Sequence, residues 1–342
     1  MAVDAPVTAT PAAATAQPRR EPGTPRHPWL GQALGSLWLL DGAAQLQARL
    51  FGPTMVTAIL QPAGAGNPSW ANLPLQLAIQ AFVRHPVLAN TAVALVQGFL
   101  GATLWLRSRS TWPYALSLLW SLLLWPFGQA FGGILSAQAS LLTGAPGSAI
   151  IYAVLTWLAW PGTFTPARGP WLLGAIWALG AVLQARPVNF TAARFTAITA
   201  ANAVGQPRAF ASLLRASGAL LASHAVFCNG VLVVTCLACA AALWSPRWRR
   251  AGLALSAACA LVLWVFGQAL GMILTGSATD PNTAPLLALI AAASWPAAPR
   301  PTRRGDQGPG GAKPWPRRTH LDGERAVAHS AQPRGQRATE GA

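Results

Sequence analysis

The sequence predicts an all-α integral membrane protein of eight transmembrane helices, arranged as two parallel repeats of four. The first observation is composition: 53% of the 342 residues are apolar and 9% are charged, whereas about 25% of the residues in soluble domains are charged. Only two of the eight acidic residues, Asp41 and Asp280, lie between positions 22 and 305. A water-soluble fold of that length needs more charge at its surface, so the chain is expected to lie in a membrane.

The second observation is an internal repeat. Residues 125–135 read Trp-Pro-Phe-Gly-Gln-Ala-Phe-Gly-Gly-Ile-Leu, and residues 264–274, 139 positions later, read Trp-Val-Phe-Gly-Gln-Ala-Leu-Gly-Met-Ile-Leu. The same shift, without a gap, pairs many other residues, among them Trp38 with Trp177, Gln45 with Gln184, His85 with His224, Asn90 with Asn229 and Pro146 with Pro285. A constant period over so much chain indicates a duplicated structural unit.

Each unit contains four apolar segments that we expect to cross the membrane as helices. They cover roughly 29–49, 86–106, 112–135 and 147–160 in the first unit, and roughly 171–185, 225–244, 251–275 and 284–297 in the second. Most approach the ~20 residues that span a bilayer, and the fourth of each unit is short. The segments 50–85 and 186–224 are too long for simple turns, and their apolar residues suggest helices lying in the outer interface.

The remaining segments lack apolar runs and are expected to face the cytoplasm. The predicted organisation is a disordered arm (1–28), membrane repeat 1 (29–160), a linker (161–170), membrane repeat 2 (171–297) and a disordered basic tail (298–342). Arginines of the loops 107–109 and 247–250 and of the tail then fall on one side, which the positive-inside rule makes cytoplasmic. We therefore expect a multi-pass protein of the bacterial cytoplasmic membrane with both termini inside.

The net charge of +16 indicates lipid rather than nucleic acid as the partner. Arginines in the basic tail and in the loops are expected to contact anionic headgroups, and a membrane-protein partner stays open. The long outer segments also carry arginines and no acid. These side chains either contact headgroups or form a basic vestibule for an anionic solute.

Asp41 is the most informative single residue. A carboxylate within a span costs at least ~2.5 kcal/mol, so it must face the helix bundle and find partners there. Trp38 and Gln45 share its helix face. The second unit keeps Trp177 and Gln184 but has Gly180 in place of Asp41. Asp41 is either a proton, cation or ligand site, or a structural carboxyl that is protonated, hydrogen-bonded or wet.

Other candidate polar residues occur in matching pairs. Gln129 and Gln268 lie in the third spans, one turn after Trp125 and Trp264, beside small-xxx-small glycine pairs that let another helix approach closely. The amides either bond across a tight helix contact or form a shared polar site between the units. Four interfacial candidates precede or begin the second spans: His85, His224, Asn90 and Asn229. Two histidines alone make a weak metal or haem site, so hydrogen bonding is the favoured role.

The sequence offers no sign of catalysis. It has no Walker loop, no G-x-S-x-G, no H-E-x-x-H and no paired carboxylate. The four cysteines, including Cys236 and Cys239, all fall in the second unit and are expected to be small apolar fillers. We predict no catalytic residue and no metal, and the sequence identifies no cofactor.

Residues 34–46, Leu-Gly-Ser-Leu-Trp-Leu-Leu-Asp-Gly-Ala-Ala-Gln-Leu, resemble the first helix of DoxX-type membrane proteins. Residues 96–101, Val-Gln-Gly-Phe-Leu-Gly, resemble the second helix, with Gln97 where an acid is expected. The resemblance implies a tandem duplication of a DoxX-like four-helix unit and a link to quinone-dependent oxidation of sulfur compounds. The whole chain also resembles uncharacterised bacterial membrane proteins with a repeated Trp-x-Phe-Gly motif.

Two functions remain in view. The sequence favours a non-catalytic membrane module or an accessory subunit of a membrane assembly, redox-linked in the DoxX case, because ionisable groups inside the membrane are scarce. The alternative is a transporter of a small solute, whose path would run between the two units near Asp41, Gln129 and Gln268.

Overall fold

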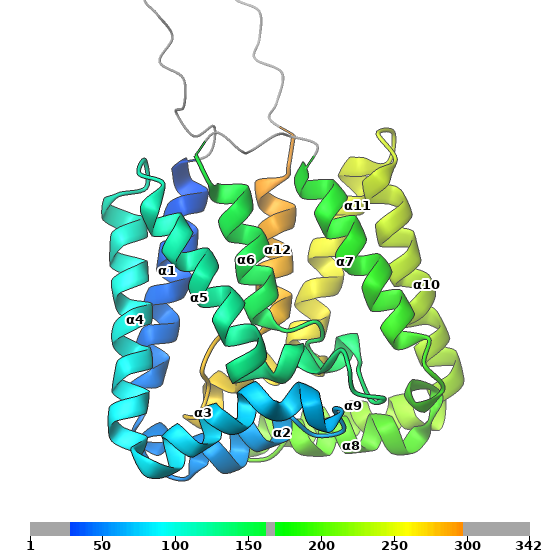
Figure 1. The fold of residues 1–342 in the computed structure, drawn as a ribbon. Helices are drawn as coiled ribbons and strands as arrows, with labels where there is room; N and C mark the ends of the chain where they lie inside the picture. Colours follow the sequence, from blue (N-terminus) through cyan, green and yellow to red (C-terminus); the bar gives the residue numbers. More distant parts are fainter. Residues whose placement is uncertain (1–27, 162–167, 297–342) are drawn as a thin grey trace, which may run out of the picture. The chain divides into compact units, whose positions relative to one another are not determined.

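The computed structural model describes residues 28–161 and 168–296, and the regular structure in these ranges is helical throughout. The predicted arm and tail, and most of the predicted linker, lie outside the described residues. The upright helices stand side by side in Figure 1: α1 (Pro28–Gln45), α4 (Pro86–Leu106), α5 (Trp112–Gln129), α6 (Ser148–Ala159), α7 (Arg168–Gln184), α10 (Ala225–Trp244), α11 (Arg249–Val262) and α12 (Thr283–Ala293). We call residues 28–161 the first half and residues 168–296 the second half.

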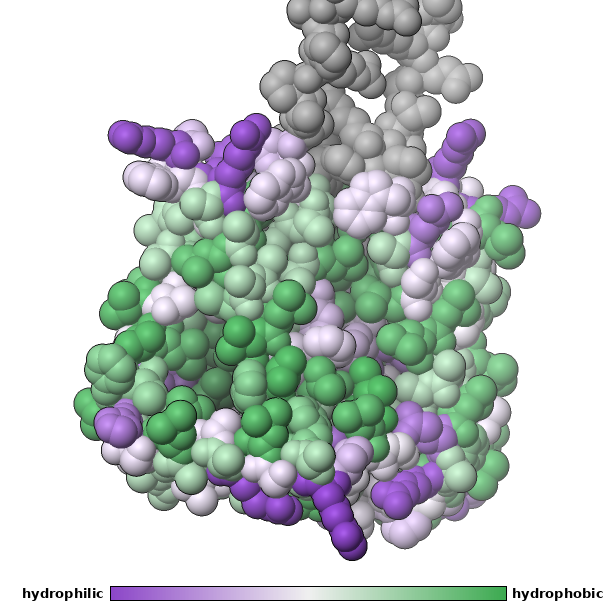
Figure 2. Space-filling model, turned by 180° about the vertical axis from the view of Figure 1, so that it is seen from behind, coloured by the Kyte–Doolittle hydropathy of each residue, from purple (hydrophilic) through white to green (hydrophobic). Residues whose placement is uncertain are grey.

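Within the described ranges, four helical stretches are long and apolar enough to cross a membrane: Pro86–Leu106, Trp112–Gly133, Ala225–Trp244 and Arg249–Gly267. The apolar helices α6 and α12 are shorter. Large apolar side chains such as Leu88, Leu106 and Phe227 are exposed. Figure 2 shows hydrophobic residues over the middle of one face and hydrophilic residues gathered at its upper and lower edges. A broad exposed apolar surface of this kind is typical of a protein solvated by lipid.

Proline and polar caps set several helix boundaries. Pro86 occupies the first turn of α4, where the missing N–H costs nothing. The side chain of Thr191 accepts a hydrogen bond from the backbone N of Arg194 at the start of α8, and that of Asn282 accepts one from the N of Thr283 at the start of α12. The helices α4 and α10 coincide with the predicted second spans, whereas α7 begins inside the predicted linker.

A layer of lateral helices lies across one end of the upright helices, at the bottom of Figure 1. It contains η2 (Met55–Leu60), α2 (Gln61–Ala63) and α3 (Leu73–Arg84) from the first half, and α8 (Ala192–Asn202) and α9 (Arg208–Ser223) from the second. The long segments therefore form lateral helices, as the sequence predicts. The beginning of α1, the end of α12 and the loops that carry Arg107 and Arg247 lie at the opposite end.

The predicted third spans are wrong at their ends, because the chain makes a left-handed reversal after each glutamine. Ala130, Phe131 and Gly132 have φ of 44°, 61° and 60° after α5 ends at Gln129. After the π-helical η7 (Leu263–Gly267), the same reversal gives φ of 48°, 57°, 65° and 61° at Ala269, Leu270, Gly271 and Met272. Left-handed backbone costs an ordinary residue ~1–2 kcal/mol. Of the predicted glycine pairs, Gly132 and Gly271 therefore serve a chain reversal.

Gly132 and Gly271 fit closely against the loop that returns to the next helix. A Cβ on Gly132 would clash with the carbonyl group of Pro146, and one on Gly271 would lie 2.8 Å from the carbonyl of Pro281. The indoles fasten the same loops, since Trp125 Nε1 donates to Pro146 O and Trp264 Nε1 donates to Pro281 O, both at 2.9 Å. Pro281, and not Pro285 as a gapless shift requires, therefore plays the part of Pro146.

Candidate ligand-binding site

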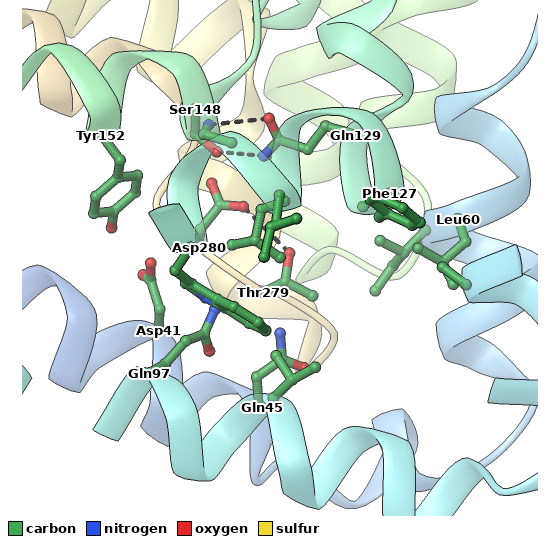
Figure 3. Close-up of a pocket in the computed structure, with 18 of the residues that line it drawn as sticks. Asp41, Gln45, Leu60, Gln97, Phe127, Gln129, Ser148, Tyr152, Thr279 and Asp280 are labelled. Carbon is green, nitrogen blue, oxygen red and sulfur yellow. Dashed lines mark hydrogen bonds between the residues drawn. The ribbon is translucent and has the colours of Figure 1, made fainter. Parts of the chain in front are cut away.

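Asp41 lies in the part of α1 that approaches the lateral helices, and 1% of its surface is exposed. It faces inward because α1 packs closely on α4 through Gly42, where a Cβ would lie 2.9 Å from Gly98 N. Asp41 Oδ1 has no hydrogen-bond partner. One turn earlier, Trp38 Nε1 donates to Ser117 Oγ at 2.8 Å, and its ring stacks on Tyr152 with centroids 4.3 Å apart. The tyrosine hydroxyl and the Asp41 carboxyl point toward one another in Figure 3.

The other acidic residue of the described chain, Asp280, lines the same cavity as Asp41. It lies in the loop before α12, where its carboxyl accepts hydrogen bonds from Asn282 N at 2.7 Å and from Thr279 Oγ1 at 3.3 Å. Burial raises the pKa of Asp280 above its usual range. Two carboxylates in one apolar site repel each other, so the pair favours a shared proton or a bound cation. A search for sequence motifs does not detect this arrangement, because the two acids are far apart along the chain.

The cavity has a volume of about 340 Å³. Its wall is largely apolar and aromatic, and includes Met55, Ile59, Leu60, Phe82, Val93, Trp120, Leu123, Leu124 and Phe127. The polar lining consists of the two carboxyls and the side chains of Gln45, Gln97, Gln129, Ser148 and Thr279 (Figure 3). An apolar wall with a few convergent polar groups is the usual composition of a small-molecule site.

Several buried polar atoms around this cavity lack a partner. The acceptors Asp41 Oδ1, Gln45 Oε1 and Gln97 Oε1 receive no hydrogen bond, and Trp120 Nε1 donates none. An unsatisfied buried group costs ~1–3 kcal/mol, and few are tolerated in folded proteins. The clustering of these four atoms at one cavity, together with the equally unpartnered hydroxyl of Tyr152, makes the cavity a candidate binding site.

A second cavity of about 540 Å³ continues the first toward the lateral helices. The two share Gln129, Ser148, Thr279 and Asp280, and the second is also lined by residues of α2 and α8. Arg194, on α8, lines the second cavity and donates from Nη2 to Gln138 O at 2.6 Å. Burial lowers its pKa, although an arginine remains charged. A polar route thus leads from Asp280 to the lateral layer.

The matching position of the second half is filled. Gly180 takes the place of Asp41, and a Cβ there would lie 3.2 Å from a Leu141 methyl carbon. Gln184 matches Gln45, but its Oε1 accepts hydrogen bonds from Ser140 Oγ at 2.9 Å and Leu141 N at 3.2 Å. Cys236 and Cys259 stand where Gln97 and Trp120 stand in the first half. Leu141 and its loop therefore fill the place beside Gly180, whereas the place beside Asp41 opens into the cavity.

The structure distributes the predicted site residues in two groups. Trp38, Asp41, Gln45 and Gln129 line the first cavity. Gln268, Trp125 and Trp264 do not line it: Gln268 Oε1 accepts from Ala284 N at 3.0 Å at the start of α12, and the indoles bind the reversal loops. Gln129 is also a cap, because its side chain accepts from Ala149 N at 3.0 Å and donates to Ser148 Oγ at 2.6 Å. The functional roles of all these site residues stay predictions.

The interfacial candidates lie away from the cavity. His85 and His224 are exposed at the breaks between lateral and upright helices, and His224 Nδ1 contacts Ser223 Oγ at 2.8 Å. Asn90 and Asn229 are buried and donate to Gln45 O and Gln184 O, which ties neighbouring helices together as expected. Among the described residues, no three His, Cys, Asp or Glu side chains gather as a metal site would require.

Sequence reasoning missed Asp280, Tyr152, Gln97, Trp120 and Ser148. The one available signal was that Asp280 is the second of the two acids in the apolar region.

A search of protein-family models, curated proteins and solved structures finds no match to this chain. The function must therefore be argued from the chemistry of the cavity itself.

Proposed function

We propose that this chain is a membrane transporter that binds a small solute in the cavity between Asp41 and Asp280. The observation that carries the proposal is the meeting of the only two acids of the described chain at one buried cavity, beside acceptor atoms without partners. Acidic residues are scarce in the described chain, but the two that are present converge. Intramembrane carboxyls that converge on a cavity are typical of solute and proton pathways.

The proposal includes eight transmembrane helices in two parallel repeats, with both termini in the cytoplasm. It is supported by matched hydrogen bonds, since Trp38 binds Ser117 as Trp177 binds Ser256. The lateral helices then lie at the outer surface, and the second cavity connects the binding site with that side. Because Asp41 belongs to one half and Asp280 to the other, a small movement between the halves alters the site, as alternating access requires.

The test is solute uptake by the full chain in proteoliposomes. A panel of labelled cationic, neutral and anionic small solutes is offered to vesicles with the wild-type protein, with Asp41→Asn, or with Asp322→Asn as a charge-matched control outside the apolar region. We expect uptake of at least one solute, a loss of roughly tenfold or more with Asp41→Asn, and no loss with the control. Wild-type vesicles that accumulate none of the panel, or an Asp41→Asn protein with undiminished uptake, would support the passive membrane module instead.

A further inference from the structure

We propose that the first cavity binds a protonated primary amine with an apolar body, one molecule per chain. This inference rests on the proposed function and names the class of solute. It is carried by three features: the charge of the cavity, the number and type of its unpartnered polar atoms, and the aromatic character of its wall.

The charge of the first cavity is one-sided. Two carboxyls line it, and no Lys, Arg or His is found among its lining residues. Arg194, the basic residue that lines the second cavity, binds Gln138 and leaves the carboxyls without a cationic partner. A carboxyl that ionises inside an apolar site requires a counter-charge, and without one it stays protonated. A cationic ligand supplies it, whereas an anionic ligand would add a further negative charge.

Three of the five unpartnered atoms at the cavity are acceptors, which call for donors on the ligand, whereas Trp120 Nε1 is a donor and the Tyr152 hydroxyl can act as either. Asp41 Oδ1, Gln45 Oε1 and Gln97 Oε1 are acceptors, each on a side chain with 3% or less of its surface exposed. An ammonium group carries three N–H donors and no acceptor, which matches three acceptor oxygens. A metal ion is a poorer candidate because an apolar cavity of about 340 Å³ is far larger than the few-ångström oxygen cage that such ions require.

The wall suits an organic body of limited size. Trp38, Trp120, Phe82, Phe127 and Tyr152 line the cavity, and aromatic faces attract organic cations as well as apolar groups. The volume lies near the lower end of the ~300–1,000 Å³ typical of ligand sites, which fits one ring with a short chain. Apolar ligands also have a route from the lipid: a groove of about 300 Å³, lined by α4 and α5, shares Trp120 and Leu123 with the cavity.

The second half explains the expected stoichiometry. There the position of Asp41 is Gly180, that of Gln97 is Cys236, and Leu141 packs against Gly180. Neither the carboxyl nor the extra acceptor is present at this place. One chain therefore offers one amine site.

Three ligands of nearly equal size test the charge selectivity. The full chain in lipid nanodiscs is titrated with 2-phenylethylamine, 2-phenylethanol and 3-phenylpropionate by calorimetry at neutral pH. We expect the amine to bind with one molecule per chain and roughly tenfold or more tighter than the alcohol, and the carboxylate not to bind. The inference is overturned if the alcohol or the carboxylate binds as tightly as the amine, although the cavity would then still be a solute site. It is also overturned if none of the three ligands binds while uptake of another solute is measurable.

Two variants locate the site. Asp41→Asn is expected to lower the affinity for 2-phenylethylamine roughly tenfold or more and to leave the affinity for 2-phenylethanol unchanged, which a general loss of packing would not do. Gln97→Cys introduces the residue found at the matching position of the second half. We expect it to lower the affinity for the amine and not that for the alcohol, so it replaces Asp41→Asn as the test if that variant does not fold. Amine binding that survives both substitutions, or that falls equally for amine and alcohol, contradicts the assignment.

Discussion

Asp280 accepts hydrogen bonds from Asn282 N and Thr279 Oγ1, whereas Asp41 Oδ1 accepts none. This difference in hydrogen bonding helps to choose between the two roles of Asp41 that the sequence left open, a binding site or a structural carboxyl. A structural carboxyl should have its acceptors satisfied within the fold, as Asp280 does. The unsatisfied oxygen of Asp41 is instead directed at a cavity, which favours a binding role.

The raised pKa of Asp280 predicts how stability varies with pH. Burial favours the protonated carboxyl in the folded chain, so the folded state holds this proton more tightly than the unfolded state, whose pKa is ~3.9. As pH rises from about 4 through the raised pKa, ionisation of Asp280 therefore destabilises the fold. Asp280→Asn removes that penalty and keeps an acceptor for Asn282 N.

Thermal unfolding of the purified protein between pH 4 and pH 8 measures the effect. We expect the Tm of Asp280→Asn to rise relative to that of the wild type as pH increases, and the two to converge near pH 4. Asp322→Asn, outside the described residues, is the control and should follow the wild type. Parallel curves for Asp280→Asn and the wild type would show that Asp280 does not titrate in this range.

At the scale of elements, the reversals after Gln129 and Gln268 decide where the cavity lies. By turning the chain left-handed, the first reversal sends residues 130–147 back to the N-terminus of α6, where Gln129 caps the helix and Ser148 and Tyr152 enter the cavity wall. A helix that continued to residue 135, as hydropathy alone suggests, could not make this return. The reversal is therefore part of the site, although none of its left-handed residues touches Asp41.

Neighbouring glycines provide a matched test of this reversal. Gly132 and Gly133 have φ of 60° and 70°, but a Cβ on Gly133 meets nothing within 4 Å, while one on Gly132 clashes with the Pro146 carbonyl. Gly133→Ala should cost ~1–2 kcal/mol of stability, the price of left-handed backbone alone. Gly132→Ala should cost clearly more, because the loop must also move. Equal Tm values for the two alanine variants would mean that the loop does not pack against Gly132.

The sequence predicted the elements well where hydropathy and chain breakers agree. Pro86 and the arginines after residue 106 bound α4 on both sides, so its ends follow from the apolar run. The third spans failed because Ile134 and Leu135 extend an apolar run past the reversal, and left-handed conformations at Phe131 or Leu270 have no signature in residue type. Gln129 was found as a candidate, but its role as a cap depends on where the loop returns.

At the scale of the whole described molecule, each half reaches into the other. Gln47 and Arg49 donate to Ala278 O and Thr275 O, and Arg186 donates to Ser136 O and Ile134 O. Thr283 Oγ1 donates to Gly144 O at 2.6 Å. These hydrogen bonds hold the loop of Asp280 at the cavity that Asp41 lines. The arrangement could not be predicted from sequence, because nothing local to either residue specifies that two positions so distant along the chain line one cavity. The cavity is thus a property of both halves together.

The shared arrangement predicts a definite topology. The Arg107 and Arg247 loops lie at one end of the upright helices, and the exposed residues Arg84 and Arg208, which belong to the lateral helices, lie at the other. If lipid surrounds the apolar middle of the bundle, these two pairs must face opposite compartments. The four native cysteines can be replaced by serine or alanine, and a single cysteine introduced at each arginine in turn.

Labelling with a membrane-impermeant maleimide then reads the topology directly. Arg107→Cys and Arg247→Cys should react in inverted vesicles, in which the cytoplasmic face is outside, and Arg84→Cys and Arg208→Cys should react in intact spheroplasts. Detergent-solubilised protein, in which all four positions should react, is the control for accessibility. If Arg107→Cys and Arg247→Cys react from opposite sides, the two halves are not parallel. The cavity between Asp41 and Asp280 could not then form as described.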